Sequence, residues 1–247
     1  MEEQTYVLSS GFGGLGDNLG FSTLPELYAK RGTPLYLWDG NPFRNSEIKK
    51  LVWDLNPFLA GTHSGPHNVG FSRTGNPYRP LHSNLISSIE MHHGFDPTNL
   101  YPKIYYVPKK LPELVDSVVV DVTAITRKRD YPKHIGALLH NHAVTLAAPE
   151  NVLVLGYKET YIDDMNLMGT DLFVENIFHM CDIIYSCKAF ISLHSGASFL
   201  ASTIVAGSGA TDLYCFIPTQ VYDMLQKNGN QAIFDNCKYI TIPRFVS

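Results

Sequence analysis

A glycine-rich stretch near the N-terminus has the residue types and spacing to bind a phosphate. Gly11, Gly13 and Gly16 form the series G-x-G-x-x-G directly after an apolar run, and Asp39 ends the next apolar run. In dinucleotide-binding proteins such glycines bring the backbone close to a pyrophosphate, and the acidic residue binds a ribose hydroxyl. One interpretation is therefore an NAD(P)-dependent oxidoreductase.

Pro25 weakens that interpretation. The helix of a dinucleotide-binding turn continues well past its glycines, and Pro25 falls in what would be the helix interior. Proline there removes a hydrogen bond, clashes with the preceding turn and costs ~3 kcal/mol. We expect either a kink at Pro25 or a helix that restarts with Thr23 as its N-cap.

Asp17 follows the glycines and is a candidate general base. A carboxylate on a tight turn at the carboxyl end of a parallel strand points into the crevice where such sheets bind ligands. Gly14, Gly16 and Asn18 would form the turn that supports it. The alternative is that Asp17 only stabilises the start of the following helix, because the helix dipole favours an acidic residue in the first turn.

Three consecutive cations form a second candidate site. Arg127, Lys128 and Arg129 follow the apolar run VVVDV, and Pro132 stands near the start of the next helix, where proline is tolerated. Cations beside a helix N-terminus create a site for an anion such as a phosphate. The alternative interpretation is a solvated run of surface charge.

A turn of small residues forms a third candidate. His194 to Ser198 follow a buried strand pattern and precede a helix rich in small residues. Such a turn can bring backbone N–H groups close to a phosphate. His194 itself could bind a phosphate when protonated, or could make a structural hydrogen bond, and the residue types leave both roles open.

The elements that would position these residues alternate between strand and helix. We expect strands at 6–9, 35–38, 103–107, 118–122, 152–155 and 190–193, and helices at 24–30, 46–56, 84–92, 134–146, 172–186 and after 193. This alternation is typical of parallel sheets with helical crossovers. Residues 56–83, rich in Gly, Pro, His and Asn, read as a long irregular segment, and such segments are usually functional or disordered. We predict an α/β fold of two Rossmann-like parallel-sheet domains facing across a cleft, residues 1–112 and residues 113–247.

Composition narrows the class of protein. The chain has 247 residues, of which 45% are hydrophobic and 17% charged, enough for one large core or two smaller ones. A net charge of -4 supplies no basic field and disfavours nucleic acid as the main partner. The N-terminus does not resemble a secretory signal, and no apolar run reaches the ~18 residues of a membrane span. We therefore expect a cytoplasmic protein, of a cell or of a virus inside one, with no membrane span.

Cysteines and histidines give no sign of a metal site. The four cysteines contain no C-x-x-C pair and are expected to be buried, reduced thiols. His92 and His93 lack the spacing of a helical zinc pair, and His63 and His67 lack an evident third ligand. We predict no metal site.

Taken together, the candidate segments resemble the heptosyltransferases of lipopolysaccharide assembly, family nine of the glycosyltransferases, which have the two-domain GT-B fold. The family has Gly-Asp before a helix with Thr-Pro or Leu-Pro, then Lys-x-Trp-Pro, then Asp-(Ser/Thr)-Gly-x-x-His-Leu-Ala. The corresponding residues here are Gly16-Asp17 with Leu24-Pro25, Arg129-Asp130-Tyr131-Pro132, and His194 to Ala201. The order of the three motifs covers most of the chain.

The resemblance implies inverting, metal-independent transfer of a sugar from a nucleotide-diphosphate sugar to a hydroxyl of a carbohydrate or glycoconjugate. In that reading Asp17 takes the proton from the acceptor hydroxyl, and Arg129, assisted by Lys128, neutralises the departing diphosphate. The first domain would bind the acceptor and the second the donor. No separate cofactor is implied, since the nucleotide sugar is a co-substrate.

The resemblance also assigns the remaining donor contacts. Backbone amides of Ser195 and Gly196, with Ala197 beside them, would hold the diphosphate oxygens. Gly156 and Tyr157 would lie beside the nucleoside.

The chain departs from the family pattern at two positions. His194 and Phe199 stand where the family has an acid and a histidine, so the contacts to the donor sugar cannot be carried over. The chain is also a short form of the fold and has no evident C-terminal helix returning to the first domain. A nucleotide-binding relative without transferase activity is therefore an alternative. The sugar, the nucleotide base and the oligomeric state are not predicted.

Overall fold

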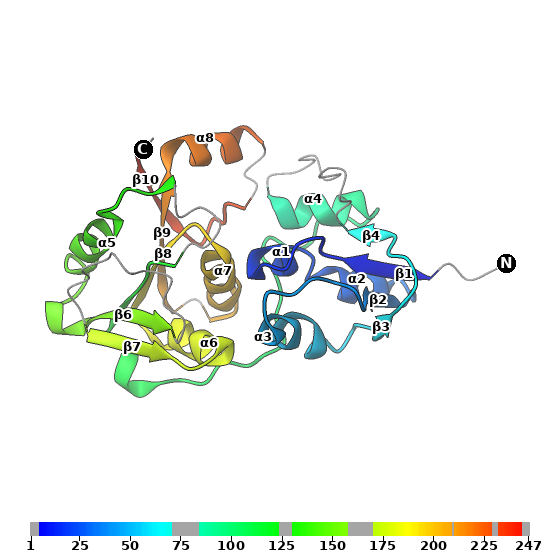
Figure 1. Ribbon diagram of the computed structural model, residues 1–247, viewed down its shortest axis with the longest axis horizontal. Coiled ribbons are helices and arrows are strands. Elements are labelled where there is room, and N and C mark those ends of the chain that lie inside the picture. The colour runs from blue at the N-terminus through cyan, green and yellow to red at the C-terminus, as the bar shows by residue number, and fades with distance from the viewer. Residues whose placement is uncertain are drawn as a thin grey trace. The chain divides into compact units, whose positions relative to one another are not determined.

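A computed structural model describes residues 5–70, 84–123, 130–157, 170–208, 210–228 and 232–243. The chain divides into two compact units, Met1–Tyr106 with Asn228–Ile233 and Val107–Lys227 with Phe234–Ser247. Each unit has its own parallel sheet (Figure 1). The first unit ends at Tyr106 rather than at residue 112. The reason is that the backbone amides of Lys109 and Leu111 donate to side chains of the second unit, Asp182 Oδ1 and Ser186 Oγ, both at 2.8 Å.

The first unit contains a four-stranded parallel sheet in the order β3-β2-β1-β4. Its strands are β1 (Tyr6–Ser9), β2 (Leu35–Trp38), β3 (Thr62–His63) and β4 (Val69–Gly70). Its helices are α1 (Leu15–Gly20), α2 (Leu24–Lys30), α3 (Ser46–Lys49), continued by a π-helix at Lys50–Asp54, and α4 (Leu85–His92). Leu8 of β1 pairs with Leu37 of β2 and with Val69 of β4, and all three side chains are buried. The turn after β1 therefore emerges from inside the sheet.

The helix restarts before Pro25, which confirms one of the two alternatives predicted for this proline. α1 ends at Gly20, and Pro25 stands in the first turn of α2, where its missing N–H is not needed. Thr23 occupies the N-cap position, but its buried hydroxyl makes no capping bond and has no hydrogen-bond partner in the part of the chain that the structure describes. The restart is therefore set by the turn and by proline rather than by a side-chain cap.

The strand expected at residues 103–107 is wrong, because residues 102–110 have no regular secondary structure. The Lys103 amide donates to Ser22 Oγ at 2.8 Å instead of to a neighbouring strand. Pro102 and Pro108 bracket the segment and supply no amide hydrogens. The segment packs as an extended chain held by side chains.

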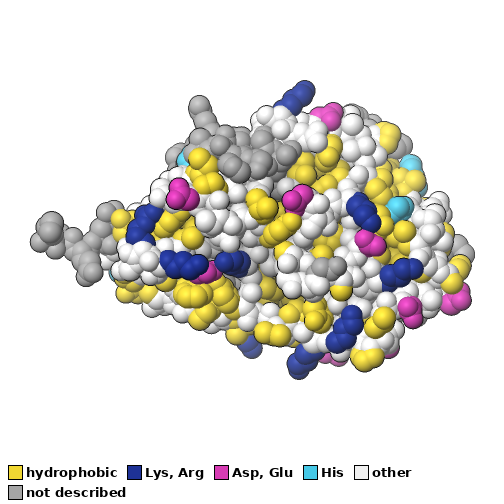
Figure 2. Space-filling view, turned by 180° about the vertical axis from the view of Figure 1, so that it is seen from behind, with side chains coloured by type: hydrophobic (Ala, Val, Ile, Leu, Met, Phe, Trp, Pro, Cys, Tyr) yellow, Lys and Arg dark blue, Asp and Glu magenta, His cyan; other side chains and the backbone are white. Residues whose placement is uncertain are grey.

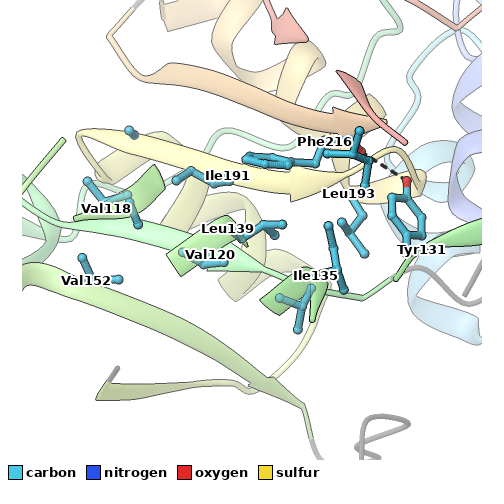
Figure 3. Close-up of a cluster of buried hydrophobic side chains, with 13 residues drawn as sticks. Val118, Val120, Tyr131, Ile135, Leu139, Val152, Ile191, Leu193 and Phe216 are labelled. Carbon is cyan, nitrogen blue, oxygen red and sulfur yellow. Dashed lines mark hydrogen bonds between the residues drawn. The ribbon is translucent and has the colours of Figure 1, made fainter. Parts of the chain in front are cut away.

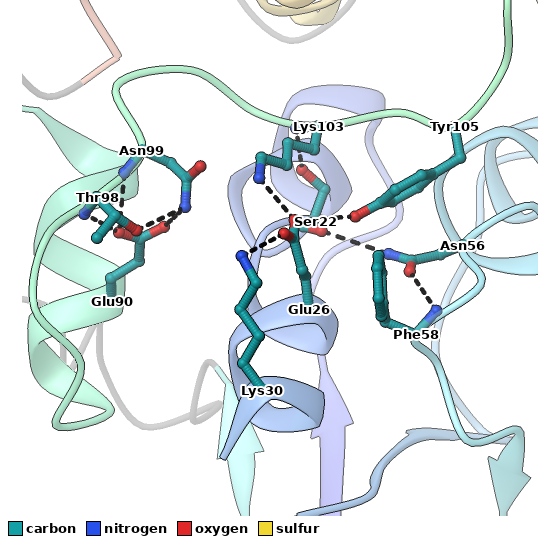
Figure 4. A network of polar contacts seen from close by, with 10 residues as sticks. All are labelled: Ser22, Glu26, Lys30, Asn56, Phe58, Glu90, Thr98, Asn99, Lys103 and Tyr105. Carbon is teal, nitrogen blue, oxygen red and sulfur yellow. Dashed lines mark hydrogen bonds and ion pairs between the residues drawn. The ribbon is translucent and has the colours of Figure 1, made fainter. Parts of the chain in front are cut away.

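Glu26 on α2 is the centre of a polar network that holds this segment (Figure 4). Its Oε1 pairs with Lys30 Nζ at 2.6 Å, and its Oε2 pairs with Lys103 Nζ at 2.6 Å. Tyr105 Oη also donates to Oε2, at 3.2 Å. Burial raises the pKa of Glu26, but the hydrogen bonds from Lys103 and Lys30 outweigh it and lower the pKa to about 2.

We expect Glu26→Gln to lower the free energy of unfolding by about 1 kcal/mol at pH 7, a discounted value for a partly exposed ion pair. Because the folded pKa of Glu26 is lowered, its contribution is present above the ordinary pKa of 4.5 and is lost as pH falls towards 2. Urea unfolding at pH 7 and pH 3 measures this. Asp54→Asn, which breaks the exposed pair with Lys49, is the control and should cost less. An equal Glu26→Gln effect at both pH values would contradict the assignment.

The second unit contains a six-stranded parallel sheet in the order β10-β9-β8-β5-β6-β7. Its strands are β5 (Val118–Asp121), β6 (Val152–Tyr157), β7 (Thr170–Val174), β8 (Ala189–Leu193), β9 (Asp212–Pro218) and β10 (Lys238–Ile242). Its helices are α5 (Ile135–Ala143), α6 (Ile177–Ser186), α7 (Gly196–Ser208) and α8 (Thr219–Lys227), with 3-10 turns at Pro112–Leu114 and Pro149–Asn151. The helix expected at 172–186 is wrong at its start, because residues 170–174 pair with β6. Neither β9, α8 nor β10 was predicted.

A buried cluster packs α5 against one face of this sheet (Figure 3). It includes Val118 and Val120 of β5, Ile135 and Leu139 of α5, and Ile191 of β8. Because side chains alternate along a strand, the intervening residues of β5 and β8 face the opposite side of the sheet. Asp121 of β5 therefore faces away from α5.

Candidate functional site

Asp17 lies in the first turn of α1, directly after the turn that follows β1. Its carboxylate rests against Gly14, because a Cβ placed on Gly14 would be 2.6 Å from Asp17 Oδ2. Gly13 is also required as glycine, since a Cβ there would be 2.9 Å from the backbone nitrogen of Arg44. The Arg44 amide in turn donates to Gly13 O at 3.0 Å. Gly14 thus makes room for the Asp17 carboxylate, and Gly13 makes room for the backbone of residues 42–44.

Partial burial raises the pKa of Asp17 above its ordinary value of 3.8. The backbone amide of Gly14, the charge of Arg44 and the amide of Asp17 itself act in the opposite direction and are weaker. The interaction with Gly14 is that of a helix N-terminus, so the stabilising role predicted for Asp17 is present. A raised pKa in the same carboxylate also makes it a stronger base than an exposed aspartate.

Asn18 serves the turn and is fully buried. Its Nδ2 donates to Gly14 O at 2.8 Å, and its Oδ1 accepts the indole N–H of Trp53 at 2.8 Å. Trp53 lies on the π-helix that follows α3. Asn18 thus ties the turn to a second helix, while Gly16 lies within α1 itself.

The dinucleotide interpretation fits this unit poorly. α1 has 6 residues and is followed by a turn, so it lacks the long helix that opens a dinucleotide-binding site. Gly11 adopts a positive φ of 71° and serves the turn after β1. Asp39 is exposed at the end of β2.

In the second unit, the strand order reverses direction between β5 and β8. β6 and β7 lie on one side of β5, and the chain then returns to form β8 on its other side. In open α/β sheets, ligands bind outside the carboxyl ends of the strands at such a reversal. Asp121 of β5, Tyr157 of β6 and His194 after β8 all lie at this edge.

The turn after β8 is held by its own serines. Ser195 Oγ accepts the Ala197 amide at 3.2 Å, and Ser198 Oγ accepts the Ser195 amide at 3.2 Å and donates to Ser195 O at 2.7 Å. The Ser195 amide is therefore engaged within the turn. No hydrogen bond from the Gly196 amide is found among the described residues, and this amide begins the 13-residue helix α7. An anion at this turn would meet the Gly196 amide first.

His194 and Phe199, the two departures from the family pattern, lie against each other. Their ring centroids are 6.4 Å apart in an edge-to-face arrangement. Phe199 also packs edge-to-face on Phe234 at 5.0 Å. The two positions at which the chain departs from the family pattern thus form an aromatic contact.

Asp121 is a candidate site residue that was not predicted from the sequence. It is fully buried, and its Oδ1 accepts the Thr123 amide at 2.8 Å and the Thr123 hydroxyl at 2.6 Å. Its Oδ2 is buried and has no hydrogen-bond partner among the described residues. Burial raises the pKa of Asp121 to about 6, against the opposing effect of the Thr123 hydrogen bonds. The signal in the sequence was an acidic residue inside the apolar run VVVDV.

Tyr157 lies close enough to Asp121 for the two to interact electrostatically. Burial and the charge of Asp121 raise the pKa of Tyr157, while its hydroxyl donates to Met180 Sδ at 3.7 Å. Gly156 on the same strand has open space where a side chain would be. Arg127, Lys128 and Arg129 lie outside the described residues.

The surface charge, the metal-ligating side chains and the cysteines of the described residues bear on what the protein could bind. Figure 2 shows positive and negative side chains interspersed over the described part of the face it presents, in line with the net charge of -4. No three His, Cys, Asp or Glu side chains among the described residues converge on a metal site, and no helix in the same residues is long and apolar enough to cross a membrane. Cys181, Cys187 and Cys215 are buried free thiols, and Cys237 is a partly buried one.

No family model and no curated protein matches the chain. Several solved glycosyltransferase structures do. A family 9 glycosyl transferase from Veillonella parvula matches with a TM-score of 0.57 at 10% identity, over 98% of this chain and 87% of that one. The E. coli ADP-heptose lps heptosyltransferase II matches with a TM-score of 0.53 at 10% identity, over 96% of this chain and 90% of that one.

The iron-containing dodecameric glycosyltransferase TibC of enterotoxigenic E. coli matches with a TM-score of 0.58 at 18% identity. The match covers 85% of this chain but 57% of TibC, so the chain spans little more than half the length of that protein. TibC has also been solved in complex with ADP-D-beta-D-heptose. The predicted resemblance is thus confirmed for the fold: this is an α/β chain with two parallel sheets, GT-B-like and similar to the heptosyltransferases of family nine.

Proposed function

We propose that the protein is a glycosyltransferase that moves a sugar from a nucleotide-diphosphate sugar to a hydroxyl of a carbohydrate or glycoconjugate acceptor. The observation that carries the proposal is the position of the motif residues within a fold shared with family 9 enzymes. Asp17, residues 130–132 and His194 each follow a central strand, at the carboxyl edge where α/β sheets bind ligands. The first unit would bind the acceptor and the second the donor.

In the proposed reaction, Asp17 accepts the proton of the acceptor hydroxyl as its oxygen attacks the anomeric carbon of the donor. The bond from that carbon to the diphosphate oxygen breaks, with inversion at the carbon. Arg129, assisted by Lys128, and the Gly196 amide stabilise the charge that develops on the departing diphosphate, in place of a divalent metal. The raised pKa of Asp17 supports the first step.

The donor would lie along the carboxyl edge of the second sheet. Gly156 and Tyr157, at the end of β6, would lie beside the nucleoside, and no described atom lies within 4 Å of the position that a Cβ on Gly156 would take. The Ala197 amide donates to Ser195 Oγ, and this hydrogen bond helps to hold the turn after β8. His194 packs on Phe199, so the donor sugar meets a surface different from that of the family motif.

The test is ligand binding followed by transfer. We expect a nucleoside diphosphate to raise the melting temperature of the wild type, because it binds only the folded state, and NAD to leave it unchanged. ADP-sugars come first in the transfer assay, since TibC was solved with one. Arg129→Ala should weaken the diphosphate affinity about 10- to 100-fold, the effect of one charge-assisted hydrogen bond. Lys133→Ala, which removes an exposed cation nearby, is the control.

Three outcomes separate the alternatives. NAD binding without nucleoside diphosphate binding would favour the oxidoreductase. Diphosphate binding without transfer or hydrolysis of any nucleotide sugar would favour a non-catalytic relative. Equal diphosphate affinity in Arg129→Ala and the wild type would remove Arg129 from the phosphate site.

A further inference from the structure

Tyr131 lies just before α5, between Asp130 and Pro132, and its side chain is 7% exposed. Its ring belongs to the apolar cluster between α5 and the sheet. Figure 3 shows the ring at the end of the cluster, with the hydroxyl directed to the backbone of Phe216 on β9. Packing in the core therefore explains why an aromatic ring stands at residue 131, but it does not explain the hydroxyl group of that ring.

The hydroxyl of Tyr131 joins three segments of the second unit. It donates to Phe216 O at 3.2 Å and accepts the backbone amide of His194 at 3.1 Å. The same His194 amide also donates to Phe216 O, at 3.1 Å. One buried oxygen thus connects the start of α5, the end of β9 and the first residue of the turn after β8.

The position of this contact gives it a specific effect. The β8–β9 register ends at the pair Leu193 and Phe216, so His194 is the first residue beyond the ladder. From Ser195 onwards, the serine hydrogen bonds described above act only within the turn. The Tyr131 hydroxyl is a tertiary contact on the backbone of the residue where the turn begins, and it lies at the strand-order reversal.

We propose that Tyr131 is a positioning residue for donor binding: its hydroxyl fixes the start of the turn at residues 194–196, and thereby the direction in which the Gly196 amide points at the diphosphate. The proposal rests on the proposed function. Tyr131 does not touch the reacting atoms and acts through the His194 backbone.

Tyr131→Phe tests the proposal, because it keeps the buried ring and removes only the hydroxyl. We expect the Kd of the nucleoside diphosphate and the KM of the nucleotide sugar to rise about 3- to 10-fold, the effect of one neutral hydrogen bond, with kcat changed much less. Hydrogen exchange should become faster in a peptide covering residues 193–199 and stay unchanged in α5.

Thr211→Val is the matched control. Thr211 belongs to the same unit, and its buried hydroxyl donates to Ile184 O and Cys187 O, both at 2.9 Å. Thr211 precedes β9, whereas Phe216 lies five residues further along the chain, within that strand. The Thr211→Val variant should lose about as much stability as Tyr131→Phe. It should not change the Kd of the nucleoside diphosphate or the hydrogen exchange at residues 193–199. An equal loss of affinity in both variants would show a general stability effect and would overturn the proposal.

A failure of the role of Tyr131 and a failure of the proposed function give different results. If the wild type binds a nucleoside diphosphate and Tyr131→Phe binds it equally well, with unchanged exchange at 193–199, only the role of Tyr131 is overturned. If the wild type binds no nucleoside diphosphate, the proposed function fails and the role of Tyr131 in donor binding fails with it.

Discussion

An Asp17→Asn variant is expected to transfer sugar at least about 10²-fold more slowly than the wild type while binding a nucleoside diphosphate equally well. The amide cannot accept the acceptor proton, and general bases are worth roughly 10²- to 10⁴-fold in rate. Donor affinity should persist because the proposed diphosphate contacts lie in the second unit. Transfer rates at saturating donor, together with calorimetry of the diphosphate, measure both quantities.

Asp39→Asn is the matched control for that variant. Asp39 is an exposed carboxylate that follows the neighbouring strand β2, and the oxidoreductase interpretation depends on it. We expect its replacement to leave transfer unchanged. A wild-type rate in Asp17→Asn would show that Asp17 is not the base. Since burial raises the pKa of Asp17, the wild-type rate should also fall as pH is lowered through that raised pKa.

The second large effect concerns stability and pH. Asp121 has a folded-state pKa raised from 3.8 to about 6, so between these values the folded state holds a proton that the unfolded state has released. Stability attributable to Asp121 is therefore fully present below pH 3.8 and is lost as pH rises through 6. At 1.36 kcal/mol per unit, the loss amounts to about 3 kcal/mol.

Asp121→Asn removes this dependence because it cannot ionise. We expect the free energy of unfolding of the wild type, relative to the variant, to fall by about 2 kcal/mol between pH 4 and pH 6, and by the remainder below and above this range. Comparing slopes rather than absolute values cancels the constant cost of burying an amide. Asp116→Asn, at an exposed carboxylate just before β5, is the control for the same change of side chain and charge. Parallel curves for Asp121→Asn and the wild type would contradict the raised pKa.

Strands with clear apolar runs were predictable from the sequence. The runs at 6–9, 35–38, 118–122 and 190–193 became β1, β2, β5 and β8, because a strand covered by helices on both faces is apolar at successive positions. Residues 172–174 gave the same signal but were assigned to the helix that follows them. The Asn176 side chain, which accepts the Phe178 and His179 amides, was the better marker of where that helix begins.

Only those candidate site residues that directly follow a strand could be predicted from the sequence. Asp17 and His194 follow recognisable strands, so their place at a sheet edge can be deduced from sequence order. Asp121 and the hydroxyl of Tyr131 matter because of contacts with residues distant in sequence or because of complete burial. Such contacts depend on packing, which a local pattern does not contain.

The hydrogen bond between Trp53 and Asn18 gives the first unit an optical reporter. The chain has two tryptophans, Trp38 and Trp53, and both belong to this unit. Trp53 is fully buried, and its indole N–H is bound to the residue next to Asp17. Fluorescence excited in the tryptophan band therefore comes from the unit that contains Asp17, because the second unit contains no tryptophan. Changes around this turn can therefore be followed in the unlabelled protein.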